Sequence, residues 1–100
     1  MSTKIWYVYM IRTNDSQLYT GITTDIQRRW QEHVSGKGGA RYFRGRKPQS
    51  LCLVEKHSDR SSASKREAQI KKYAKPLKES LVAQLKDSID LEPFKNLTSA

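Results

Sequence analysis

The sequence predicts an α+β domain in which a small, mostly antiparallel three-stranded sheet is flanked by helices, in the order ββαβαα. Three observations support this prediction: three short segments are rich in aromatic and β-branched residues, a turn joins the first two, and helical patterns follow the second and third. The chain has 100 residues, which is enough for one hydrophobic core. We therefore expect one domain over residues 1–90 and a polar, frayed C-terminal tail over residues 91–100.

The first two strands are predicted to form a hairpin. Residues 4–12, KIWYVYMIR, place apolar side chains on both alternating faces, which is typical of a central strand covered on both sides. Residues 13–16, TNDS, favour a turn, and residues 17–22, QLYTGI, return as the second strand. The hairpin places one tyrosine on each strand, at Tyr9 and Tyr19.

The pairing register decides whether these tyrosines share a face of the sheet. If Tyr9 lies opposite Tyr19, both side chains point to one side, and so does Gly21 two positions further along. Because Gly21 has no side chain, it would leave space beside a phenol for a phosphate to approach. A slip of one residue would separate the tyrosines onto opposite faces, and the sequence leaves both registers open.

The first helix is predicted to begin at Thr24, where Gln27 would complete a capping box. Asp25 suits the positive end of the helix, and Gly36 suits its C-terminal end. Three apolar residues at helical spacing are expected to form the buried stripe: Ile26, Trp30 and Val34.

The two adjacent arginines of this helix are not equivalent. At about 100° per residue, Arg29 and His33 fall beside the buried stripe on the same side, whereas Arg28 faces water. Arg29 and His33 lie one turn apart, so their side chains can act together. The alternative is that Arg29 only covers Trp30 with its aliphatic stem.

Two further helices are predicted after a third strand at residues 50–57, SLCLVEKH. The second helix runs from Asp59 or Ser61 to about Tyr73, and the third begins at Pro76, a residue favoured in a first helical turn. The apolar stripe of the third helix is expected to comprise Leu77, Leu81, Leu85 and Ile89.

Glu67 breaks the apolar pattern of the second helix. It falls within the stripe that Ala63, Ile70 and Ala74 define, and a carboxylate there costs free energy unless it is paired or bound to a cation. One interpretation is a salt bridge to a neighbouring basic residue such as Lys71. The other is a hard metal ion such as Mg²⁺, which takes one or two carboxylates and completes its shell with water and phosphate oxygens.

The chain carries a formal net charge of +9, from 19 Lys and Arg against 10 Asp and Glu. Such an excess favours polyanionic partners, with nucleic acid first among them. A single cysteine, Cys52, excludes an internal disulfide and favours the cytoplasm. No apolar run approaches the roughly 20 residues of a membrane span, and no secretory pattern begins the chain, so we expect no membrane association. His33, His57 and Cys52 lack the spacing of a structural zinc site.

A basic loop is predicted over residues 37–48, KGGARYFRGRKP. Its glycines indicate mobility, and its cations would contact phosphates, which position a nucleic acid but carry no sequence information directly. With Gly21 on the second strand, the residues expected to contact nucleic acid are Lys37, Arg41, Tyr42, Arg44, Arg46 and Lys47.

Four features follow one another along the chain: YVY at residues 7–9, YTG at residues 19–21, Arg29 with His33 on the first helix, and Glu67 on the second. In this order they resemble the motifs of the GIY-YIG endonuclease superfamily, over roughly residues 4–73. The resemblance is strongest to its small, stand-alone bacterial branch, whose members are a nuclease domain and little else. The sequence departs from the family pattern at the first motif's glycine, which is a tyrosine here. It also has no clear counterpart of an asparagine that many members carry near the end of the domain.

The resemblance implies a metal-dependent endonuclease that hydrolyses phosphodiester bonds in nucleic acid, with DNA the expected substrate. Tyr19 would be the general base, and Tyr9 would orient the attacking water or share that role. Arg29 would stabilise charge on the phosphorus, and Glu67 would hold a single Mg²⁺ or Mn²⁺ ion. His33 would bind a phosphate oxygen or act as an alternative base.

Two other functions remain open from the sequence. The first is a DNA- or RNA-binding module that keeps the fold without the chemistry and stacks Tyr42 or Phe43 on an unpaired base. The second is a basic protein that docks on acidic partners. Loss of cleavage on substitution of the tyrosines, Arg29 and Glu67 would distinguish the enzyme from both.

Overall fold

A three-stranded antiparallel sheet with the strand order β2-β1-β3 forms the centre of the computed structural model, which describes residues 4–98. Its strands are β1 (Trp6–Thr13), β2 (Leu18–Thr23) and β3 (Pro48–His57). The helices are α1 (Ile26–Ser35), α2 (Arg60–Lys71) and α3 (Lys75–Leu85), with two short 3-10 helices, η1 (Arg41–Arg44) and η2 (Glu92–Phe94). The predicted α+β class, the order ββαβαα and the central position of the first strand are all confirmed.

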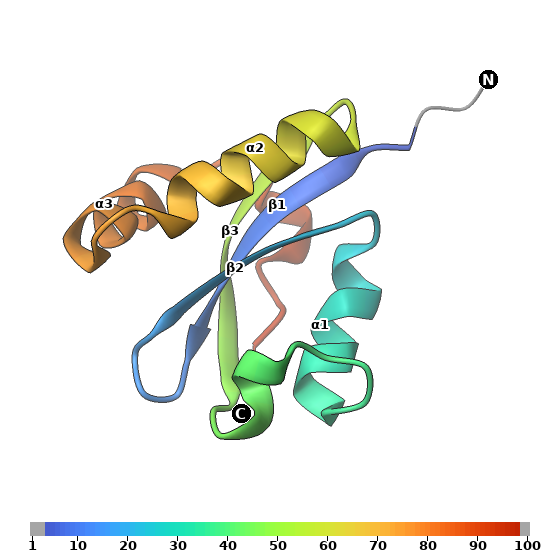
Figure 1. Ribbon diagram of the computed structural model, residues 1–100, viewed down its shortest axis with the longest axis vertical. Coiled ribbons are helices and arrows are strands. Elements are labelled where there is room, and N and C mark those ends of the chain that lie inside the picture. Colours follow the sequence, from blue (N-terminus) through green and yellow to red (C-terminus); the bar gives the residue numbers. More distant parts are fainter. Residues whose placement is uncertain (1–3, 99–100) are drawn as a thin grey trace.

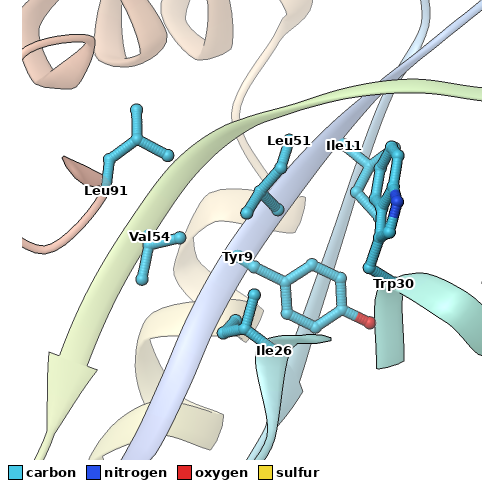
Figure 2. Packing of buried hydrophobic residues seen from close by; sticks show 7 residues of the cluster. All are labelled: Tyr9, Ile11, Ile26, Trp30, Leu51, Val54 and Leu91. Atoms are coloured by element: carbon cyan, nitrogen blue, oxygen red, sulfur yellow. The ribbon is translucent and has the colours of Figure 1, made fainter. Parts of the chain in front are cut away.

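Helices cover both faces of the sheet, because α1 and α2 lie on opposite sides of the strands (Figure 1). The α2 side packs around Val8, Met10 and Ile70 and is also covered by α3. The α1 side packs Ile26 and Trp30 of that helix against side chains of β1 and β3 (Figure 2). Val8 and Met10 on one face of β1, and Tyr9 and Ile11 on the other, are buried, as its sequence predicts.

The hairpin register places Tyr9 opposite Gly21 and Tyr19 opposite Ile11. This differs by two residues from the register in which the tyrosines face each other directly. Because side chains alternate with a period of two, a shift of two residues keeps both tyrosines on the α1 side of the sheet.

The start of α1 differs from the prediction by one residue. Asp25, not Thr24, is the N-cap, since its carboxylate accepts a hydrogen bond from the Arg28 N–H. Asp25 can cap the helix because its short carboxylate reaches the N–H three residues ahead. The helix ends as predicted at Gly36, whose φ of 76° lies in the left-handed region that glycine adopts without strain.

The buried stripe of α1 is also rotated relative to the prediction. Ile26 and Trp30 are buried, but Val34 is 43% exposed and His33 takes the interior position, with 2% exposure. The helix ends one residue after Val34, so its last turn extends past the apolar core.

The second and third helices correct two further predictions. Asp59, one of the two caps that the sequence allowed, caps α2 by accepting the Ser62 N–H, but α2 ends two residues before Tyr73. α3 ends at Leu85, so Ile89 lies beyond it and is 87% exposed. Leu77 is half exposed, and the predicted stripe is reduced to Leu81 and Leu85, which pack against the α2-side core.

The chain after Asp90 packs back on the α1 side, so the prediction of a frayed tail is wrong for residues 91–98. Leu91 is buried in the core of that side, and Phe94 lies edge-on against Tyr7. The Leu97 carbonyl accepts a hydrogen bond from the Leu51 N–H of β3. Residues 99–100 lie outside the described part of the chain.

In residues 4–98, the helices are all too short or too polar to cross a membrane.

Candidate active site

Three rings from separate elements converge on the α1 side of the sheet. Tyr9 of β1, Tyr19 of β2 and His33 of α1 have ring centroids 5.5 to 6.2 Å apart. The Tyr9 hydroxyl oxygen lies 2.9 Å from Nε2 of His33. The Tyr9 ring fills the space between β1 and α1 with its hydroxyl pointing toward the helix (Figure 2). Residues distant in the sequence therefore form one polar cluster at the edge of the core.

Gly21 makes room for the Tyr9 phenol. A Cβ atom at Gly21 would lie 2.6 Å from the Tyr9 hydroxyl oxygen and 3.1 Å from the Tyr19 ring. The space above this glycine is thus filled by the protein itself, which corrects the expectation that it stays open for a phosphate. Any side chain there would displace the hydroxyl from His33, so Gly21 is required by the geometry of the cluster.

The hydrogen bonds of His33 define which ring nitrogen carries its proton. The Ala40 N–H donates to Nδ1 at 3.2 Å, so Nδ1 is the acceptor of the neutral ring. The proton is therefore on Nε2, which donates to the Tyr9 hydroxyl oxygen. Both ring nitrogens are therefore occupied by hydrogen bonds within the protein.

Burial keeps His33 neutral. Desolvation first, and the nearby Arg29 guanidinium second, lower its pKa from 6.5 to about 4. A neutral ring is needed for the Ala40 hydrogen bond, because a protonated Nδ1 cannot accept. The imidazole thus stays in its Nε2–H form across the neutral pH range.

This pKa predicts a loss of stability in mild acid. An unfolded histidine titrates near pH 6.5, so between about pH 6.5 and pH 4 the unfolded chain binds the proton first. His33 therefore stabilises the fold fully above this window, and up to about 3 kcal/mol is lost as the pH falls through it. In urea unfolding at pH 7 and pH 4.5, we expect the wild type to lose about 2–3 kcal/mol more than His33→Gln. Equal losses in the two proteins would contradict the low pKa.

Burial also raises the pKa of Tyr9. The desolvation effect is the largest, the neighbouring Tyr19 adds to it, and Arg29 opposes it by favouring the phenolate. Tyr9 is 2% exposed and remains a neutral phenol at neutral pH. Tyr19 is only partly buried and is the more accessible of the two hydroxyl-bearing rings.

Arg29 is held at the rim of this cluster. Its Nη1 donates to Oε1 of Glu32 and to the Gly38 carbonyl oxygen, each at 2.8 Å. Of the five N–H groups of a guanidinium, these bonds use the two on Nη1. Three others remain for Tyr9 and for an anion in front of the site. Arg28 is exposed and its side chain takes no part in these bonds, so the predicted difference between the two arginines is confirmed in position.

The segment after α1 forms an aromatic wall beside the rings. Phe43 of η1 lies 4.5 Å from His33 and 5.0 Å from Tyr19, measured between ring centroids. Tyr42 lies 5.2 Å from Tyr19. Since residues 41–44 form a turn of 3-10 helix, part of the predicted mobile loop has a defined shape.

The cations of this segment are held in different ways. Arg46 pairs with Asp15 at 2.9 Å and lies over the Tyr42 ring at 4.7 Å. A hollow of about 580 Å³ beside His33 is lined by residues that include Arg41 and Arg44. The cations with exposed side chains are Lys37, Arg41, Arg44 and Lys47.

Glu67 lies on α2, the helix that covers the other face of the sheet. Its Oε2 is 3.3 Å from the Lys71 ammonium, and 23% of its side chain is exposed. The salt bridge that the sequence allowed is therefore present. The assignment of Glu67 as the metal ligand stays a prediction.

Comparison with known proteins assigns the chain to a family. Residues 5–80 match the GIY-YIG catalytic domain. The chain belongs to the GIY-YIG family. It is 49% identical over 79 residues to the UPF0213 protein YhbQ of Escherichia coli O8, which covers 79% of this chain and 78% of that protein. YhbQ of Shigella boydii serotype 18 is 48% identical over the same shares of the two chains.

A solved structure of a relative has the same fold. The solution NMR structure of the UPF0213 protein BH0048 from Bacillus halodurans superposes with a TM-score of 0.55 and is 35% identical. The match covers 95% of this chain and 99% of that one. The small bacterial branch that the motifs indicate is thus confirmed.

Membership of the GIY-YIG family gives the class of chemistry. The family is one of nucleases, which bind nucleic acid and are generally metal-dependent. Residues 4–98 contain no group of three or more His, Cys, Asp or Glu side chains able to hold a metal ion. One partly buried carboxylate such as Glu67 fits a hard cation that takes its other ligands from water and phosphate, so the cation would bind together with substrate.

Some groups of the site were not found from the sequence. Glu32 lies three residues after Arg29 on the same helix, and this spacing was a usable signal for an ion pair. The Gly38 carbonyl and the Ala40 N–H left no signal, since every residue carries such groups and only the folded loop directs them at the site.

Proposed function

We propose that this GIY-YIG protein is a metal-dependent endonuclease that hydrolyses phosphodiester bonds in DNA. The observation that supports this most directly is the convergence of Tyr9, Tyr19, His33 and Arg29 on one face, from three elements of the fold. A purely structural cluster does not need a cation beside the tyrosines, whereas a phosphodiester site does, and Arg29 supplies one. The positive charge of the chain suits a polyanionic substrate.

Tyr19 is the proposed general base. Tyr9 is buried, and its oxygen already accepts from His33, so Tyr9 acts as a neutral donor that orients water or stabilises a neighbouring phenolate. Tyr19 is more accessible, and as the general base its hydroxyl oxygen takes a proton from the attacking water. The oxygen of that water bonds to phosphorus as the bond to the leaving oxygen breaks.

Arg29 stabilises the charge that develops on the phosphorus oxygens. Glu32 and the Gly38 carbonyl fix Nη1, which directs the rest of the guanidinium toward the tyrosines without a large loss of entropy on substrate binding. Glu67 would hold a Mg²⁺ or Mn²⁺ ion, which would supply positive charge to the leaving oxygen. Lys71 shields this carboxylate when the cation is absent.

The proposal is tested by cleavage of a panel of labelled DNA substrates comprising single strands, duplexes and branched structures. We expect cleavage that requires Mg²⁺ or Mn²⁺ and is lost on addition of EDTA. Glu67→Ala should remove activity, while the control Glu79→Ala, which breaks a distant pair with Arg12, should retain it if the fold persists by circular dichroism. Binding without cleavage of any substrate at any metal concentration would instead indicate the non-catalytic module.

The exposed cations of the loop should contact phosphates. We expect Arg41→Gln with Arg44→Gln to weaken binding to all DNA sequences alike and to flatten the slope of log affinity against log salt by up to about 1.8. The control Lys78→Gln with Lys86→Gln removes the same charge from α3 and its C-cap, on the other face of the sheet. Equal slopes for the two double variants would show that the loop does not touch DNA.

A further inference from the structure

The short segment between α1 and η1 contacts the site through its backbone. The Gly38 carbonyl accepts from Arg29, and the Ala40 N–H donates to His33. These two backbone groups flank Gly39. One three-residue segment thus holds both polar side chains that α1 contributes to the site.

Gly39 sets how closely this segment approaches α1. A Cβ atom at Gly39 would lie 2.7 Å from the Glu32 carbonyl oxygen and 3.0 Å from the His33 Cα. Both are backbone atoms of a helix, so they cannot rotate away as a side chain can. Gly39 has no positive φ, so the requirement for glycine at this position is one of space and not of backbone strain.

The two hydrogen bonds have different consequences. The Gly38 carbonyl shares Nη1 of Arg29 with Glu32 and so fixes the plane of the guanidinium. The Ala40 N–H occupies Nδ1 of His33 and so fixes the proton on Nε2, facing Tyr9. Moving the segment outward would free the arginine to rotate and the imidazole to change tautomer, with every catalytic side chain still present.

We propose that residues 38–40 form a backbone clamp that positions Arg29 and His33, and that Gly39 is a positioning residue because only glycine lets the clamp close. This role in turnover rests on the proposed nuclease function, whereas the clamp geometry does not. The charged and titratable groups near His33 are Tyr9, Tyr19, Arg29 and Glu32, with Arg41 and Arg44 lining the same hollow, and none of them belongs to the clamp.

The test compares Gly39→Ala with the control Gly45→Ala. Gly45 lies in the same loop, with open space around its Cα and a φ of −111° that alanine adopts. The tautomer and pKa of His33 are followed by ¹⁵N and ¹H NMR in each protein, and cleavage and DNA affinity are measured alongside. In Gly39→Ala we expect His33 to show a mixture of tautomers and a pKa shifted from about 4 toward 6.5, with Gly45→Ala unchanged.

The expected effect on turnover follows from the outward movement of residues 38–40 that Gly39→Ala would cause. A shift of a catalytic group by about 1 Å can lower turnover by roughly a hundredfold. Gly39→Ala should therefore lower kcat by about tenfold to a hundredfold while KM and DNA affinity stay within about twofold of the wild type. An unaltered His33 spectrum, or an altered spectrum with unaltered kcat, would overturn the clamp as a positioning device.

A wild-type measurement keeps the proposal open to refutation even if Gly39→Ala does not fold. The clamp requires His33 in its Nε2–H form at neutral pH. It also requires an Ala40 amide that exchanges with solvent more slowly than that of Arg41. The Nδ1–H form, or fast exchange at Ala40, would refute it. If the clamp is seen by NMR but no nucleic acid is cleaved, the proposed function fails and the clamp geometry stands.

Discussion

Replacing Arg29 by alanine should abolish DNA cleavage with little change in DNA affinity. The guanidinium is fixed by Glu32 and the Gly38 carbonyl, and its remaining N–H groups lie beside Tyr9, where a phosphate would enter. Removing one such donor from a developing oxyanion costs about 10²–10³ in kcat, and loss of the whole cation should cost at least as much. Ground-state affinity depends mainly on the exposed cations of the loop, so the Kd should stay within about threefold.

Arg28→Ala is the matched control for this experiment. It removes the same charge one residue away, from an exposed side chain on the outer surface of α1. Single-turnover cleavage at saturating metal, with affinity measured by fluorescence anisotropy, separates an effect on chemistry from one on binding. Similar losses from the two variants would show that Arg29 acts as surface charge only.

The fold was predictable because local and global signals agree along most of the chain. Alternation of apolar residues on both faces of residues 4–12 required a covered central strand, and β1 is that strand. Helix ends were less certain. Thr24 and Asp25 are both good N-caps, so the start of α1 could not be chosen between them without the hydrogen bond to Arg28.

Patterns at the ends of elements failed for a physical reason. Val34 and Ile89 continue apolar stripes in the sequence, but the helices that would carry them end before or just after these residues. A periodic apolar pattern does not show where a helix ends or where the chain turns away from the core. The opposite error was made for the C-terminal tail, which was expected to be frayed. Its apolar residues Leu91 and Phe94 are enough to anchor it against β1 and β3.

The site was predictable where it depends on periodicity and not where it depends on the loop. The helical wheel separated Arg29 and His33 from Arg28, and the folded chain places both beside the tyrosines. The pairing register of β1 and β2 could not be fixed to better than two residues, because a shift of two residues leaves every side chain on the same face of the sheet. The directions of loop backbone groups depend on tertiary packing alone, so the contacts of residues 38–40 were beyond a sequence argument.

The largest effect among the tyrosines should come from Tyr19→Phe. This change removes one oxygen and keeps the ring that packs against His33 and Phe43, so the cluster should stay folded. If Tyr19 is the general base, its loss should lower kcat by about 10²–10⁴, the usual range for a positioned base. Tyr9→Phe should have a smaller effect on kcat, because Tyr9 is a buried neutral phenol that does not take the proton of the attacking water.

Tyr7→Phe is the control, because Tyr7 shares this face of β1 but packs against Phe94, away from the convergence of rings. Its cleavage rate should match that of the wild type. The rates are best compared over a pH series at saturating metal, since a base that must be a phenolate gives a rate that rises with pH until the phenol is ionised. The Tyr19→Phe protein should lose this rise, while Tyr9→Phe keeps it at a lower level. Retention of the pH dependence in Tyr19→Phe, with its loss in Tyr9→Phe, would exchange the roles of the two tyrosines and make the buried phenol the base.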